Sequence, residues 1–158
     1  MFEAAFFIYF RMKKLYLDVC TICRPFDDQN QIRVRMETSA FYLILSHVQK
    51  GFYELSISPV HYKEVASISD SFEKIQVETL LRTYDQKHFY DLPVVLQRAE
   101  EFISKGAGIA DATHLAMAEH SSDFFITCDD KLLKKAAKLK LKVTVTDPLT
   151  FCIKENLK

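Results

Sequence analysis

Four acidic residues have the type and spacing to form one metal site: Asp18, Glu64, Asp111 and Asp129. Asp18 directly follows a short apolar run, at a place where burying a charge without a partner is costly. Carboxylates held close together repel one another, and a divalent cation offsets that repulsion. Because these are hard oxygen ligands, with no thiolate or imidazole pattern beside them, the residue types favour Mg²⁺ or Mn²⁺.

Taken singly, each of three acids also has a structural explanation. Asp111 and Asp129 suit the first turns of helices, and Glu64 suits a solvated helix face. His114 is interpreted as a residue of a helix face near the same segment. The metal interpretation therefore depends on whether the fold brings the four acids together.

Strands alternate with helices along the chain. Hydrophobic patterns and turn residues predict strands at 15–17, 52–58, 123–127 and 142–146, with a further short strand possible at 89–92. Helices are expected at 34–50, after Ser58-Pro59, at 71–86, 93–105, 112–119 and 131–139, and from Pro148. This alternation predicts an α/β fold with a central, mostly parallel sheet covered by helices on both faces.

In parallel α/β sheets, ligands bind outside the carboxyl ends of the strands. Asp18 and Asp129 follow expected strands, and Asp111 lies where an alanine-rich helix begins. The macrodipole favours an acid in that first turn. We therefore expect the acids to converge at one edge of the sheet.

Length and composition indicate one domain. The chain has 158 residues, 49% of them hydrophobic, which is enough for a sizeable core but short for two domains. Lys plus Arg equals Asp plus Glu at 21 each, so any surface for nucleic acid must be local. The apolar stretch from Ala4 to Phe10 is far shorter than the ~20 residues of a membrane span. We expect residues 1–11 to be an N-terminal extension, residues 12–158 to be the domain, and the protein to be cytoplasmic with reduced cysteines.

Four segments together resemble the PIN-domain family, which includes VapC-type toxins of toxin–antitoxin modules. They are LYLD at 15–18, SPVHYKEV at 58–65, GIADATHLAMA at 108–118 and FITCDDKLL at 125–133. Their order spans residues 13–150, nearly the whole chain. The segment from Arg24 to Gln29, followed by Arg33 and Glu37, resembles a PIN subgroup with a longer loop after the first strand.

The resemblance implies a three-layer α/β/α fold and a metal-dependent endoribonuclease that hydrolyses RNA phosphodiester bonds. On this basis Asp18 and Asp111 are direct ligands of one or two Mg²⁺ (or Mn²⁺) ions, and Glu64 and Asp129 are ligands or orient water. The resemblance also implies an RNA substrate, a possible cognate antitoxin and a homodimer, with no membrane partner. A catalytically silent PIN scaffold that binds RNA or protein is the alternative.

Two details depart from the family pattern or leave a choice open. Many PIN domains carry a small hydroxyl or amide residue directly after the first aspartate, whereas Val19 stands here and Thr21 is the nearest hydroxyl. Thr21 is the candidate substitute. Asp130 competes with Asp129 for the last acidic position, and we favour Asp129 because it directly follows the expected strand end.

Other motifs favour simpler interpretations. Cys20 and Cys23 form a CxxC, but no second pair completes a zinc set, and free cysteines behave as small hydrophobes. A phosphoryl-transfer domain with a nucleophilic Asp18 would need an Asp-x-Asp pattern or a Gly-rich loop, and the chain has three glycines. Basic residues follow two of the acids and could form a solvated face or hold phosphates; they are Arg24, Arg33, Arg35, Lys131, Lys134, Lys135, Lys138, Lys140 and Lys142.

Overall fold

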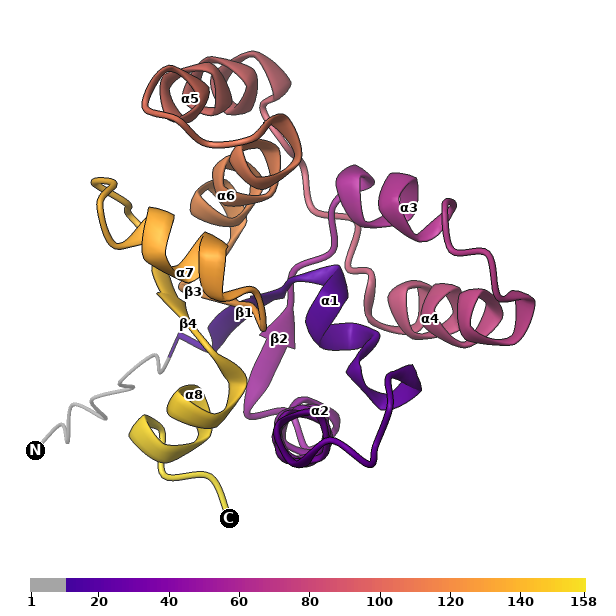
Figure 1. Ribbon diagram of the computed structural model, residues 1–158. Helices are drawn as coiled ribbons and strands as arrows, with labels where there is room; N and C mark the ends of the chain where they lie inside the picture. The colour runs from indigo at the N-terminus through magenta and orange to yellow at the C-terminus, as the bar shows by residue number, and fades with distance from the viewer. Residues whose placement is uncertain (1–10) are drawn as a thin grey trace, which may run out of the picture.

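A computed structural model describes residues 11–158 and shows a parallel sheet between layers of helices (Figure 1). The strands are β1 (Lys13–Leu17), β2 (Tyr53–Leu55), β3 (Phe124–Ile126) and β4 (Thr144–Thr146). They lie in the order β2-β1-β3-β4, and every neighbouring pair is parallel. The expected α/β fold with a central parallel sheet is confirmed.

Helices connect the strands and cover both faces of the sheet. Two short elements follow β1, namely α1 (Val19–Ile22) and the 3₁₀ helix η1 (Arg24–Phe26). The longer helices are α2 (Ile32–Gln49), α3 (Pro59–Val65), α4 (Ser71–Tyr84), α5 (Leu92–Ser104), α6 (Ile109–Ser121), α7 (Asp130–Ala136) and α8 (Pro148–Lys154). The bounds differ from those expected by a few residues, as helix ends commonly do.

The alternation along β1 explains why both faces of the sheet are covered. Leu15 and Leu17 point into a core formed with α2, α4 and α8, whereas Tyr16 points into the core formed with α5 and α6. All three side chains are almost fully buried. Because neighbouring residues of a strand face opposite sides, the consecutive apolar residues 15–17 require a helical layer on each face of the sheet.

The short strand considered at 89–92 is wrong. Residues 85–91 form an irregular connection between α4 and α5, in which Tyr90 donates a hydrogen bond to the backbone oxygen of Ile57 at 3.0 Å. The side chain of Asp91 instead caps α5. The segment thus serves packing through Tyr90 and capping through Asp91, and a pattern of four residues does not distinguish these roles from strand pairing.

Two further expectations concern the ends and the surface of the chain. Residues 1–10 lie outside the described part, so the proposed extension up to residue 11 remains an expectation. Within residues 11–158, none of the helices has both the length and the apolar character needed to cross a bilayer.

Candidate metal centre

Asp18 lies where β1 ends, at the carboxyl edge of the sheet. Its backbone N–H donates to the carbonyl oxygen of Ile126 at 2.9 Å, which continues the β1–β3 ladder by one residue. Asp18 precedes α1 but makes no side-chain cap, so its carboxylate is free to face the sheet edge. Burial raises the pKa of Asp18, since only 8% of the residue is exposed.

The hydroxyl that holds Asp18 comes from Thr127. Thr127 Oγ1 donates to Asp18 Oδ2 at 2.7 Å, and the Cys20 thiol donates to the same oxygen at 3.3 Å. Since Leu17 pairs with Ile126, the next residue on each strand, Asp18 and Thr127, must be neighbours. Sequence reasoning missed this role of Thr127.

Thr21 does not substitute for the missing hydroxyl. Its Oγ1 donates to the backbone oxygen of Ile126 at 3.2 Å, and its side chain is fully buried. The expectation that Thr21 assists Asp18 is therefore wrong, because the first turn of α1 directs this side chain towards the backbone of β3.

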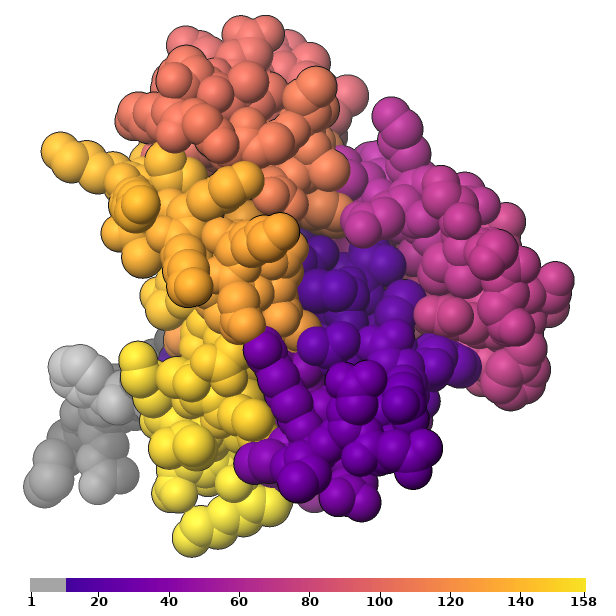
Figure 2. Space-filling model, viewed as in Figure 1, coloured from indigo at the N-terminus to yellow at the C-terminus, as the bar shows by residue number. Residues whose placement is uncertain are grey.

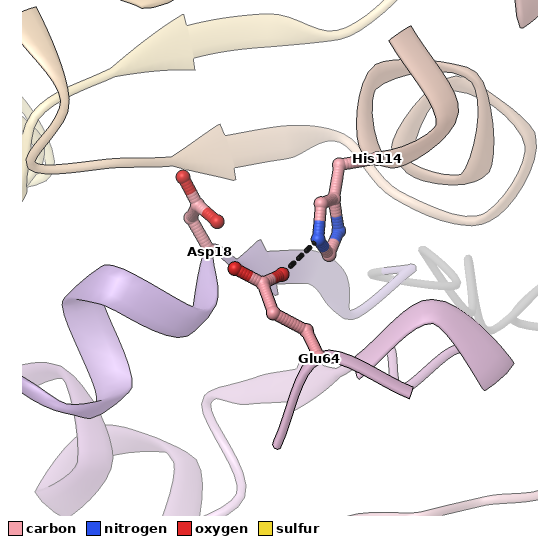
Figure 3. Close-up of side chains that lie close together, drawn as sticks. All are labelled: Asp18, Glu64 and His114. Atoms are coloured by element: carbon pink, nitrogen blue, oxygen red, sulfur yellow. Dashed lines mark hydrogen bonds and ion pairs between the residues drawn. The ribbon is translucent and has the colours of Figure 1, made fainter. Parts of the chain in front are cut away.

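Glu64 and His114 complete a compact group with Asp18 (Figure 3). Glu64 comes from α3 and His114 from α6, and Glu64 Oε2 lies 2.5 Å from His114 Nε2. One potential ligand atom from each of the three residues lies within 4.8 Å of the others. The hydrogen bond from His114 lowers the pKa of Glu64 and stabilises its charged form.

Asp111 and Asp129 lie beside this group but not within it. Asp111 is in the first turn of α6, and its pKa is raised by burial and then by the charge of Asp129. Glu64 raises the pKa of Asp111 further, whereas Lys135, whose Nζ lies 4.0 Å from Asp111 Oδ2, lowers it. The structure thus brings the carboxylates of Asp18 and Glu64 together. Asp111 and Asp129 lie outside this group, but the charges of Glu64 and Asp129 still raise the pKa of Asp111.

Asp129 and Asp130 have different partners despite being adjacent. Asp129 is the N-cap of α7, and its Oδ1 accepts from the backbone nitrogens of Lys131 and Leu132 at 2.8 and 3.2 Å. Asp130 is bound by Arg33 through two contacts of 2.6 and 2.8 Å, which lower its pKa. This pairing draws Asp130 towards α2, whereas the charge of Asp129 acts on Asp111. The choice of Asp129 as the acid of the site stays a prediction.

The arginines after β1 are largely occupied by acids. Glu37 is only 2% exposed and accepts from Arg24 Nε at 2.5 Å and from Arg33 Nε at 2.8 Å. Arg24 also pairs with Asp27 at 2.9 Å. Lys135 is better placed than Arg24 or Arg33 to contact a phosphate, because its Nζ lies 4.0 Å from Asp111 Oδ2 and its side chain is 46% exposed.

The four cysteines are free thiols in the structure. Cys20 and Cys128 lie against each other, and their contact raises the pKa of Cys20 and lowers that of Cys128. Cys23 is half-buried among apolar side chains of the core. Among residues 11–158, the group of potential metal ligands contains no cysteine, in keeping with a site made of hard ligands.

The donor set fits a hard divalent cation. Asp18 and Glu64 supply carboxylate oxygens, and the hydroxyl of Thr127 keeps one Asp18 oxygen in place. The side chains of Asp18, Glu64 and His114 come from three separate elements around the end of β1. Figure 2 shows a hollow there, with the α3 segment on one side and the α6 and α7 segments on the other. A cation there would relieve the burial cost that raises the pKa of Asp18 and Asp111.

Comparisons with known proteins show the fold. No protein-family model matches the sequence, and no curated protein matches it. The structure is similar to a chain in the crystal structure of FitAcB from Neisseria gonorrhoeae, with a TM-score of 0.51, 17% identity, and coverage of 85% of this chain and 98% of that one. At this identity the likeness concerns architecture alone, and it shows that the chain has a PIN-like three-layer α/β/α fold.

Proposed function

We propose that the protein is a metal-dependent endoribonuclease. The observation that carries this proposal is the convergence of Asp18, Glu64 and His114 at the carboxyl end of β1, with Asp111 and Asp129 beside them, in a PIN-like fold. A divalent ion, Mg²⁺ or Mn²⁺, would polarise the phosphodiester and lower the pKa of water. Asp18 and Asp111 are the proposed direct ligands, and Glu64 and Asp129 are proposed as ligands or as groups that orient the attacking water.

The residues around the acids suit this task. Thr127 and Cys20 hold one Asp18 oxygen by hydrogen bonds, which keeps the carboxylate oriented before a cation binds. Lys135 reaches Asp111 from α7 and could turn to a substrate phosphate when a cation compensates that carboxylate. The chain carries no net charge, so we expect such local cations to draw RNA to the site.

A direct test is cleavage of labelled single-stranded RNA by the purified protein with Mn²⁺ or Mg²⁺. We expect endonucleolytic fragments that disappear when EDTA is added. An Asp18→Asn protein prepared in parallel controls for contaminating ribonucleases, which would cleave equally in both samples. Equal cleavage by the two proteins would contradict the proposal.

A catalytically silent scaffold is the second candidate. It is favoured by the position of Asp111 and Asp129, which lie outside the group of ligand atoms within 4.8 Å. If catalysis requires all four acids, a site in which only Asp18 and Glu64 are close enough to bind the same cation could hold that cation without cutting RNA. Binding of Mn²⁺ by calorimetry, with no cleavage of any RNA tested, would favour this alternative.

We further propose that the nuclease is the toxin of a toxin–antitoxin module, acts in the cytoplasm and pairs as a homodimer. The support is the resemblance of the sequence segments to VapC-type toxins together with the PIN-like fold. Exposed apolar side chains such as Ile32, Met36 and Phe72 provide surface for a second copy or an antitoxin. Arrest of cell growth by the wild type but not by Asp18→Asn would support toxicity, and light scattering should give twice the 18.4 kDa mass of the chain.

A further inference from the structure

Both ring nitrogens of His114 are already engaged by other side chains. Nε2 lies 2.5 Å from Glu64 Oε2, and Nδ1 lies 2.7 Å from Tyr16 Oη. The His114 side chain is only 4% exposed, so water cannot take the place of either partner without rearrangement. An imidazole nitrogen binds a metal through its lone pair, and a nitrogen that donates a hydrogen bond has none to offer.

The contact with Glu64 decides the state of Nε2. The Glu64 side chain is 46% exposed, and an exposed glutamic acid at neutral pH is a carboxylate, which only accepts hydrogen bonds. Its contact with Nε2 therefore requires the hydrogen to belong to Nε2. Distance alone admits His114 as a ligand beside Asp18 and Glu64. The hydrogen on Nε2 argues against that role, because it points at the carboxylate rather than leaving a lone pair for a cation.

The hydrogen-bonded chain continues into the core. Tyr16 Oη lies 2.8 Å from Ser58 Oγ, and the backbone N–H of Ser58 donates to His61 Nδ1 at 3.0 Å. Since Nδ1 of His61 accepts, its Nε2 carries the hydrogen and donates to the backbone oxygen of Leu17 at 2.8 Å. Tyr16, Ser58 and His61 are at most 1% exposed. The chain of contacts therefore runs from Glu64 through four buried side chains to the residue that precedes Asp18.

We propose that His114 is a positioning residue that holds the Glu64 carboxylate towards Asp18, and that it is not itself a metal ligand. Figure 3 shows one Glu64 oxygen bound to His114 and the other turned towards Asp18. Tyr16 is hydrogen-bonded to the other nitrogen of the His114 imidazole and to Ser58. His61 in turn is hydrogen-bonded to the backbone of Leu17, at the end of β1. This inference rests on the proposed function, because it assigns the role of a residue within the same site.

Pulsed electron paramagnetic resonance of bound Mn²⁺ separates a ligand from a positioning residue. With histidine labelled with ¹⁵N, a directly bound imidazole produces a nitrogen coupling in the spectrum of the metal. We expect no such coupling in the wild type. A nitrogen coupling that disappears in His114→Gln would overturn the proposal.

Affinity for Mn²⁺ provides the second readout, with a matched pair of variants. His114→Leu removes the donor to Glu64, and we expect roughly 10- to 100-fold weaker binding, as for other groups that orient metal ligands. His114→Gln keeps an amide donor near the Nε2 position and should restore most of the affinity. Equal losses in the two variants would contradict a role based on the hydrogen bond.

The route through Glu64 can be tested in a double-mutant cycle. In a Glu64→Gln background, His114→Leu should cause no further loss of Mn²⁺ affinity, because the carboxylate it positions is gone. Independent losses in the two positions would mean that His114 acts on the metal directly, against the proposal.

A measurement on the metal-free protein separates this inference from the proposed function. In ¹⁵N-labelled wild type, NMR should show a hydrogen on His114 Nε2 whose resonance shifts in Glu64→Gln. Absence of that hydrogen would overturn the positioning role even if RNA is cleaved. If the hydrogen is present but the protein neither binds Mn²⁺ nor cleaves RNA, the hydrogen bond between His114 and Glu64 is confirmed but the proposed nuclease function is wrong. In that case His114 does not position a metal ligand either.

Discussion

Two groups of acids lie near the carboxyl ends of β1 and β3. In the first, Asp18 and Glu64 lie at the edge of the sheet with Asp111 beside them, and Lys135 Nζ lies 4.0 Å from Asp111 Oδ2. In the second, Glu37 and Asp130 are bound by the guanidinium groups of Arg24 and Arg33. Burial raises the pKa of Asp18 and Asp111 in the first group, whereas Arg33 lowers the pKa of Asp130 in the second.

The comparison shows that the same residue type serves two purposes according to the charge beside it. Acids that arginines already compensate join α2 to the segment after β3, as Arg33 does with Glu37 and Asp130. Acids that lack such partners make folding less favourable unless a cation or a proton compensates them. The candidate metal site therefore differs from the neighbouring Arg24–Arg33–Glu37–Asp130 network in that arginines neutralise the acids of the network.

The largest effect is expected when a site carboxylate loses its charge. Asp18→Asn and Asp111→Asn keep the side-chain size, and each should reduce RNA cleavage by roughly 100-fold or more, because electrostatic stabilisation of the transition state is lost. Initial rates on a labelled RNA at saturating Mn²⁺ measure this. Glu100→Gln, on the exposed face of α5, is the matched control and should cleave normally. Full activity of both site variants would refute the acidic-site interpretation.

The adjacent residues Asp129 and Asp130 should differ in their effect on RNA cleavage. Asn caps helices about as well as Asp, so Asp129→Asn should keep α7 and lose only a charge near Asp111. We expect its cleavage rate to fall about 10- to 100-fold, whereas Asp130→Asn should stay within about twofold. Circular dichroism verifies folding of both variants. A larger loss in Asp130→Asn would assign the acidic position to Asp130 instead.

Breaking the arginine network should affect stability more than activity. Removing one partner of a buried ion pair typically costs about 3–5 kcal/mol. Because the side chains of Arg24 and Arg33 are 20% and 51% exposed, we expect Glu37→Gln to lower the free energy of unfolding by about 2 kcal/mol. Urea denaturation measures the loss, with Glu100→Gln again as the control. An unchanged midpoint would mean that the network contributes little.

The smallest effect concerns the pH dependence of stability without metal. Burial raises the pKa of Asp18 above its value in the unfolded chain, so its contribution to stability is present below the unfolded pKa of about 4 and is lost as pH rises through the folded pKa. In EDTA, Asp18→Asn should therefore melt at the same temperature as the wild type or a few degrees higher at pH 7, and this difference should shrink towards pH 4. A variant that melts well below the wild type at pH 7 would indicate a structural aspartate.

The order of strands and helices was predictable from the sequence because it depends on local patterns. Apolar runs of three to five residues, Ser58-Pro59, and the glycines at 51 and 106 mark elements that the structure contains. Both of these glycines have positive φ, of 80° and 95°, where a helix has just ended. The positions of Asp18 after a strand and of Asp111 in the first turn of a helix were also local properties. The segment at 89–92 was ambiguous, because its three apolar or aromatic residues suit packing as well as pairing.

The partners of the acids were decided by the tertiary structure. Thr127 reaches Asp18 across a sequence separation of 109 residues because β3 pairs with β1. His114 reaches Glu64 across 50 residues because the side chains of α6 and α3 face each other at the sheet edge. Arg33 similarly takes Asp130 from 97 residues away. The local sequence shows which side chains are acidic and indicates where each helix or strand ends. The residue that compensates each charge depends instead on strand order and register, which are set by long-range packing.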